Sequence, residues 1–195
     1  TQYVSPTHVT AFRGQNMELH CIYGGTPLPD VVWKKMSSPL DGSRYTFLNY
    51  GKTLQITDVR FEDEGDYVCQ ASNGIGSQQT HSTHVEVLSA PFWKKAPNNT
   101  NAAEGETVVF ECEADGAPHP NLQWFMNGQV IEKAPYNRRR KVKDNRLTIE
   151  NLIKSDTAVF QCNASNIHGY AFKDFYLNVL ALEPSIIEKP EELTL

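Results

Sequence analysis

The chain has 195 residues, a length that allows one or two domains. Apolar residues make up 39% of the chain and aromatic residues 10%, and this composition excludes an intrinsically disordered protein. No apolar run approaches the roughly 18 residues that a membrane-spanning helix needs, and a net charge of −5 argues against a dedicated nucleic-acid binder, which would be basic.

Short stretches in which every second residue is apolar recur along the chain and predict half-buried β-strands. In chain order, the clearest of these stretches are residues 17–21, 54–56, 67–71, 108–112 and 147–149. Clusters of Pro and Gly, which are typical of turns, lie between them. Because no stretch of about 12 residues shows helical spacing, we expect an all-β protein.

The sequence contains one internal repeat. The stretch Gly25–Trp33 matches Gly116–Trp124, and Cys69–Asn73 matches Cys162–Asn166. The repeating unit has the size of a small all-β domain, about 90 to 100 residues. We therefore expect two tandem domains, followed by a linker toward a further domain. Their expected boundaries are 1–89 and 90–182 for the domains and 183–195 for the linker.

Each predicted domain holds two of the four cysteines. Four cysteines permit three pairings, and their spacing alone does not choose among them. There is no Cys-x-x-Cys pair, so neither a zinc site nor thioredoxin-type redox chemistry is supported. The cysteines are Cys21, Cys69, Cys112 and Cys162.

A Cys, a Trp twelve residues later, and a second Cys with an aromatic residue two positions before it resemble the immunoglobulin fold. The resemblance implies two I-set β-sandwiches, each with one disulfide between its own two cysteines, Cys21 to Cys69 and Cys112 to Cys162. It also implies that Trp33, Tyr67, Trp124 and Phe160 are core residues. Persistent disulfides imply an extracellular or secretory compartment.

The two copies differ just before their second cysteine. The first copy reads Asp63-x-Gly65-x-Tyr67, the corner motif of the immunoglobulin fold, in which the tyrosine hydroxyl bonds to the backbone. The second copy has Phe160 at the tyrosine position. Because phenylalanine has no hydroxyl, we expect this hydrogen bond in the first domain alone.

Longer runs, at residues 11–29, 103–112 and 173–179, resemble the neuroglian-type family of neural cell-adhesion molecules. The junction Pro91–Trp93 resembles the join between the third and fourth immunoglobulin domains of that family. The resemblance implies homophilic and heterophilic cell adhesion by the extracellular part of a plasma-membrane protein. Its partners would be other cell-surface adhesion proteins, either copies of itself or relatives.

The resemblance further implies that these two domains fold against the preceding immunoglobulin domains of their own chain, as half of a four-domain horseshoe. The alternative is a secreted immune recognition protein similar to hemolin, which would bind microbial surfaces. The two domains alone discriminate weakly between these functions, because hemolin shares the horseshoe.

Two Asn-x-Ser/Thr motifs, at Asn98 and Asn163, predict N-linked glycans in a secreted protein. Asn163 directly follows Cys162, so the pleat of the strand should turn Asn163 outward if Cys162 points inward. A glycan there would cover part of the sheet that, in the immunoglobulin fold, holds the strand of Trp124 (strand C), the strand of Cys162 (strand F) and the last strand of the domain (strand G), and would deny that surface to a protein partner.

A basic stretch, made of Arg138, Arg139, Arg140, Lys141 and Lys143, is the sharpest charge feature of the sequence. One interpretation is a binding site for a sulfated glycosaminoglycan or another anionic partner. The other is a solvated strand in which one arginine pairs with Asp156, as Arg44 would pair with Asp63 in the first copy. We prefer the second interpretation, because many short basic runs do not bind an anionic partner.

We expect neither a metal site nor catalysis. His81 and His84 are the nearest histidine pair, and their odd spacing places them on opposite faces of a strand. No nucleophile elbow, phosphate-binding loop or metal motif occurs in the sequence. The sequence therefore predicts a binding protein that has no cofactor.

Overall fold

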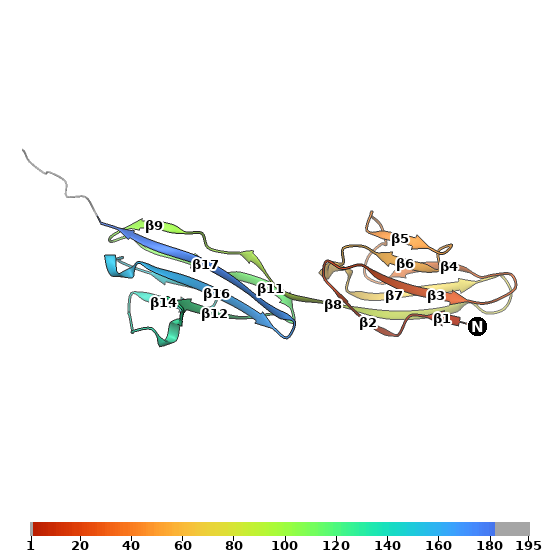
Figure 1. Cartoon of the computed structure of the whole chain (residues 1–195). Helices are drawn as coiled ribbons and strands as arrows, with labels where there is room; N and C mark the ends of the chain where they lie inside the picture. The colour runs from red at the N-terminus through yellow and green to blue at the C-terminus, as the bar shows by residue number, and fades with distance from the viewer. Residues whose placement is uncertain (1, 182–195) are drawn as a thin grey trace, which may run out of the picture. The chain divides into compact units, whose positions relative to one another are not determined.

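The structure is a computed structural model that describes residues 2–181. The predicted linker, residues 183–195, lies outside the described residues. Contacts between residues divide the chain into two units, 1–89 and 90–195. Each unit is built from β-strands, as the period-two alternation predicts (Figure 1), and the helical segments within residues 2–181 are short 3-10 turns.

The first unit consists of two sheets. Its elements are β1 (Gln2–Val4), β2 (His8–Phe12), β3 (Met17–Tyr23), β4 (Asp30–Lys35), β5 (Tyr45–Leu48), β6 (Thr53–Ile56), η1 (Phe61–Asp63), β7 (Gly65–Ser72) and the first part of β8 (Gln79–Lys95). One sheet has the order β1-β3-β6-β5. In the other, β7 lies between β4 and β8, and β2 pairs with β8 in parallel.

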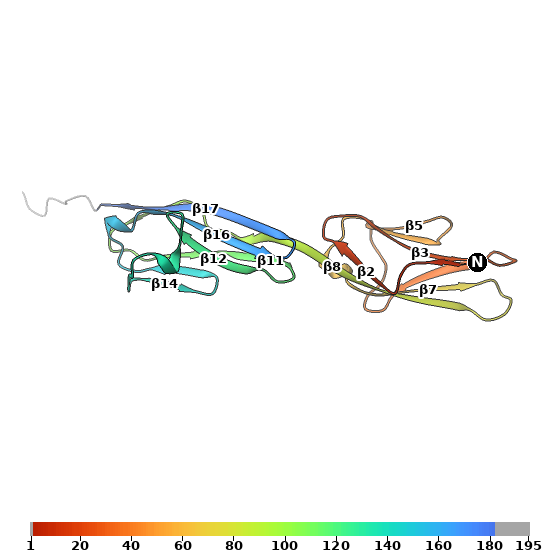
Figure 2. The ribbon, with the colours of Figure 1, turned by 60° about the horizontal axis from the view of Figure 1, so that its bottom comes forward.

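The second unit has the same plan. Its elements after β8 are β9 (Thr100–Ala103), β10 (Val108–Glu111), β11 (Glu113–Ala117), β12 (Asn121–Met126), β13 (Gln129–Val130), η2 (Ile131–Lys133), β14 (Arg140–Lys143), β15 (Arg146–Ile149), η3 (Lys154–Asp156), β16 (Ala158–Asn166) and β17 (Gly169–Leu180). One sheet has the order β10-β15-β14, and the other β13-β12-β16-β17-β9. Figures 1 and 2 both show β16 and β17 side by side as a long antiparallel pair.

Alternating residues of the central strands build each core. In β7, the inward residues Tyr67, Cys69 and Ala71 are buried, and β16 repeats this pattern from Phe160 onward. The core of the second unit contains a cluster of three phenylalanine rings, in which the Phe110 and Phe175 centroids are 4.7 Å apart. Each fully buried side chain of this size stabilises its unit by about 1.5–3 kcal/mol.

The turn between β12 and β13 shows how local sequence sets the ends of the strands. Asn127 and Gly128 both have positive φ, of 49° and 78°. Two-residue hairpin loops with positive φ at both positions match the twist of the flanking strands, and Asn-Gly adopts them at the lowest steric cost. The pairing of Phe125 with Val130 therefore follows directly from this dipeptide.

Candidate functional site

Each unit contains one disulfide, Cys21–Cys69 in the first and Cys112–Cys162 in the second. The bonded cysteines have Cα–Cα distances of 6.4 and 6.6 Å, which lie within the usual range. In the chain-entropy account, closing a loop of about 50 residues contributes roughly 4 kcal/mol. The cysteines therefore have a structural role and offer no reactive thiol.

The tryptophan of each unit contacts the opposite sheet through its ring nitrogen. Nε1 of Trp33 donates to the carbonyl of Gly51 at 2.8 Å, and Nε1 of Trp124 donates to the carbonyl of Asp144 at 3.4 Å. Trp124 is buried, whereas Trp33 is half-buried. These bonds join β4 and β12 to the turns that precede β6 and β15.

The tyrosine corner of the first unit is centred on a buried carboxylate. The hydroxyl of Tyr67 donates to the backbone carbonyl of Asp63 at 2.6 Å. The Asp63 carboxylate accepts hydrogen bonds from Arg44, from the hydroxyl of Tyr45 and from the amide of Arg60. Burial alone would raise the pKa of Asp63, but these donors outweigh it and hold that pKa below its usual value. Burial and the bond to Asp63 raise the pKa of Tyr45 to about 12.

The second unit keeps the ion pair of this corner without the tyrosine. Phe160 stands at the position of Tyr67 and, having no hydroxyl, cannot donate the corner hydrogen bond. Arg139 donates to both carboxylate oxygens of Asp156, at 2.6 and 2.9 Å, and the amide of Ile153 donates at 2.8 Å. Burial would raise the pKa of Asp156, and these donors lower it below the usual value. This is the arginine pairing that the sequence analysis preferred.

Three of the five cations of the basic stretch have partners within the second unit. Arg139 is occupied by Asp156, and Arg140 donates to the carbonyl of Pro135 at 2.9 Å. Lys141 lies 3.9 Å from the carboxylate of Glu150. The two remaining cations, Arg138 and Lys143, are exposed.

The two glycosylation motifs lie in different surroundings. Asn98 is exposed between β8 and β9, and the hydroxyl of Thr100 donates to its backbone carbonyl at 3.0 Å. Asn163 lies within β16, between buried Cys162 and buried Ala164, so it belongs to the outer face of the sheet. It is half-buried there.

The same outer face carries aromatic residues that the sequence analysis missed. Tyr170, Phe172 and Tyr176 of β17 are 69%, 51% and 42% exposed. They stand at even-numbered positions of the strand, whereas the odd-numbered residues Phe175 and Leu177 are buried in the core. The sequence does contain a signal for them, because the strand has apolar residues on both of its faces and the core needs only one apolar face.

A second unanticipated arrangement is a stacked histidine pair in the first unit. His8 and His84 are paired across the parallel strands β2 and β8, with ring centroids 5.5 Å apart. His8 lies 3.1 Å from Glu86, and His84 lies 2.8 Å from Asp66. Within residues 2–181, no three His, Cys, Asp or Glu side chains are grouped so as to hold a metal ion.

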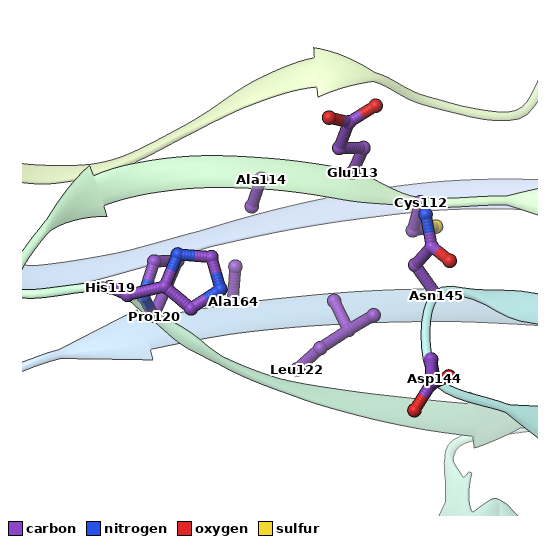
Figure 3. Close-up of a pocket in the computed structure, with 9 residues that line it drawn as sticks. All are labelled: Cys112, Glu113, Ala114, His119, Pro120, Leu122, Asp144, Asn145 and Ala164. Carbon is purple, nitrogen blue, oxygen red and sulfur yellow. The ribbon is translucent and has the colours of Figure 1, made fainter.

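A cleft of about 410 Å³ opens in the second unit between β11, β12 and the turn before β15 (Figure 3). Its apolar lining comes from Cys112, Ala114, Pro120, Leu122 and Ala164, and its polar lining from Glu113, His119, Asp144 and Asn145. Figure 3 shows His119 apart from both carboxylates. Cys112 has no free thiol, because it is disulfide-bonded. The residues that line the cleft do not assemble a nucleophile with a base.

Comparisons with known proteins agree with this architecture. Residues 91–179 match the family described as the Immunoglobulin I-set domain, and residues 2–73 match the Immunoglobulin domain family. Hemolin, an insect immune protein, has a similar structure, with a TM-score of 0.77 and 29% identity over 91% of this chain and 46% of that chain. Immunoglobulin domains 1–4 of Sidekick-1 give a TM-score of 0.56 and 29% identity, over 92% of this chain and 48% of that chain.

Proteins of similar sequence point to a narrower group than the fold does. Neuroglian of Drosophila melanogaster is 49% identical over 97% of this chain and 15% of its own length. Neurofascin of Gallus gallus is 37% identical over 98% of this chain and 14% of its own length. Neuronal cell adhesion molecule of Mus musculus is 38% identical over 96% of this chain and 15% of its own length. The chain thus spans about one seventh of the length of these relatives.

The fold and the matched families define a tandem of immunoglobulin-like domains of the I-set type. More narrowly, the chain is similar to the neuroglian-type neural cell-adhesion molecules of the immunoglobulin superfamily. The resemblance found in the sequence is therefore confirmed. Among residues 2–181, no helix is long and apolar enough to cross a membrane.

Proposed function

We propose that the chain is a non-catalytic part of the extracellular region of a cell-surface adhesion receptor. The observation that carries this proposal is the 49% identity to Neuroglian over 97% of the chain. Two disulfides, one in each unit, suit an extracellular setting, because such bonds persist in oxidising compartments. The partners we propose are cell-surface adhesion proteins, either copies of the same protein or its relatives.

The way in which these units contribute is also a proposal. We propose that they pack against preceding immunoglobulin domains of their own chain and thereby form half of a four-domain horseshoe. Contacts between domains of one chain bury about 600–1,500 Å² and are fairly polar. Each unit has its own core and disulfide, so it can fold without that contact.

Glycans on Asn98 and Asn163 belong to the same proposal. Asn98 is exposed and Asn163 lies on the outer face of its sheet, so a glycan on either residue could leave the unit without disturbing its core. A sulfated glycosaminoglycan is a weaker candidate as a partner. Of the five cations in the basic stretch, Arg139 and Arg140 are already engaged within the unit.

The alternative function is a secreted, hemolin-like protein that recognises microbial surfaces. The observation that favours it is the TM-score of 0.77 to hemolin. We prefer the adhesion receptor, because identity to hemolin is 29% whereas identity to Neuroglian is 49%.

The test of the proposed function is aggregation of cells that display the longer ectodomain on their surface. We expect the intact ectodomain to aggregate suspended cells and a version lacking residues 1–195 to lose this activity at equal surface expression. If the shortened version aggregates cells as strongly as the intact ectodomain, these two units do not contribute to adhesion. If the intact ectodomain instead binds microbial surfaces and fails to aggregate cells, the hemolin-like alternative is correct.

A further inference from the structure

Two exposed aromatic rings lie beside the glycosylation motif of β16. Asn163 is paired in register with Phe172 of β17, and residues paired in this way have Cβ atoms about 4.5–5.5 Å apart on the same face. The ring of Tyr170 stands edge-on to that of Phe172, with centroids 5.4 Å apart. Nε1 of Trp93 donates to the carbonyl of Phe172 at 3.3 Å and helps to fix its backbone. We call Tyr170 and Phe172 together the aromatic platform.

The other direct neighbour of Asn163 is polar and already engaged. Asn163 pairs with Gln123 of β12, and the side-chain amide of Gln123 donates to Glu132 at 3.0 Å. Of the two residues directly across from Asn163, Phe172 is therefore the one that offers an apolar surface. A group attached to Asn163 would leave the sheet beside this surface.

The side-chain amide of Asn163 is half-buried on the outer face of the sheet. Its amide oxygen is buried and has no hydrogen-bond partner among the described residues. The nitrogen, the atom to which an N-linked glycan is bonded, is not among the buried polar atoms that lack a partner. A sugar on this nitrogen would start beside Phe172, the residue paired with Asn163 across β16 and β17.

The first unit provides an internal comparison. Its equivalent strands β7 and β8 place Gln70 opposite Thr80, and Gln70 is followed by Ala71 and Ser72. The acceptor asparagine and the aromatic partner are thus both absent from the first unit, although the Ala-Ser that follows is the same in both. In the second unit, both are present. The acceptor asparagine and the aromatic ring therefore occur together, at one pair of register positions, in the second unit.

We propose that the aromatic platform binds the first N-acetylglucosamine of a glycan on Asn163 and is therefore not a docking site for a protein partner. The proposal rests on the glycosylation of Asn163 proposed above. One face of a pyranose ring presents C–H groups, and such a face packs on an aromatic ring and removes apolar area from water. Phe172 and Tyr170, at 51% and 69% exposed, leave that area available.

The test uses the chain secreted from insect cells and trimmed to one sugar residue per site. The variants are Asn163→Gln, Phe172→Thr, which copies Thr80, and the double variant. Intact mass gives the occupancy of Asn163, and NMR gives the chemical shifts of the sugar protons. We expect an upfield ring-current shift of these protons that Phe172→Thr abolishes. We also expect Phe172→Thr to lower the unfolding midpoint of the second unit by about 4 °C in the glycosylated chain and to leave it nearly unchanged in the Asn163→Gln background.

A matched control places a glycan in the first unit without an aromatic neighbour. Gln70→Asn creates a motif opposite Thr80, and we expect unshifted sugar protons there. A shift equal to that at Asn163 would overturn the proposal. The proposal would also be overturned if Asn163 carries a glycan but its sugar protons are unshifted and the effects of Asn163→Gln and Phe172→Thr on the unfolding midpoint are additive. That result would still support glycosylation of Asn163. An unoccupied Asn163 would overturn both the glycosylation and the platform.

Discussion

Arg44 holds the carboxylate of Asp63 through two hydrogen bonds, of 2.6 and 2.9 Å, and the Asp63 side chain has no solvent exposure. Arg139 and Asp156 repeat the pair in the second unit with the same two distances, although Asp156 keeps 7% exposure. In each unit, the pair joins the segment before the edge strand to the 3-10 turn that precedes the second cysteine. The pair is therefore a constant feature of the two corners, whereas the tyrosine is not.

The first prediction concerns the removal of each arginine. Arg44→Ala leaves a fully buried carboxylate without its charged partner, and such a change costs about 3–5 kcal/mol. Arg139→Ala should cost less, because Asp156 is partly exposed and can regain water. Denaturant unfolding of each unit expressed alone measures both free energies. A loss for Arg139→Ala equal to or greater than that for Arg44→Ala would show that burial of the carboxylate does not set the cost.

The second prediction concerns the corner hydroxyl. Tyr67→Phe removes the donor to the carbonyl of Asp63 and leaves that buried acceptor unpaired, at a cost of about 1–3 kcal/mol. The substitution lies in the first unit, so the stability of the second unit, which has phenylalanine at the equivalent position, should not change. Calorimetry of the tandem protein with and without Tyr67→Phe resolves the two units. An unchanged unfolding transition of the first unit would mean that the hydroxyl hydrogen bond contributes nothing to its stability.

The third prediction is a loss of stability in acid. The pKa values of Asp63 and Asp156 lie below the usual value of about 3.9. The unfolded chain therefore binds protons first as the pH falls, so the stabilisation is complete above about pH 4 and is lost as the pH drops through the folded pKa. Unfolding free energies between pH 7 and pH 2 measure this effect. Asp156→Asn should flatten the acid limb of the second unit, and an unchanged slope would contradict the assignment.

The fourth prediction concerns the disulfides. Removing one of them, as in the double variant Cys112→Ala with Cys162→Ala, should destabilise its unit by about 2–5 kcal/mol. The other unit keeps its own core and bond, so its transition should stay in place. Peptide mapping under non-reducing conditions gives the pairing independently. A peptide joining Cys69 to Cys112 would contradict both the pairing and the two-unit architecture.

The sequence was sufficient to predict the central strands, because their inward residues alternate and their cysteines anchor a recognisable repeat. It did not reveal that the run 108–112 is broken at Cys112, where β10 ends and β11 begins with a different pairing partner. Alternation continues across such a break, so periodicity alone does not detect it.

Two surface clusters were missed for a related reason. His8 and His84 are far apart in the sequence and meet only because β2 pairs with β8 in parallel. Phe172 lies opposite Asn163 because of the β16–β17 register. Both arrangements depend on pairing between strands, which a motif search along one strand does not examine.

We have proposed that these two units take part in adhesion together with preceding domains of the same chain. Bead aggregation tests it most directly, with beads coated at equal density with residues 1–195 or with the longer ectodomain. The account predicts that residues 1–195 remain folded, soluble and mainly monomeric and leave the beads dispersed, whereas the longer ectodomain aggregates them. Aggregation by residues 1–195 alone, at the strength of the longer ectodomain, would place adhesion wholly within these two units and contradict the account.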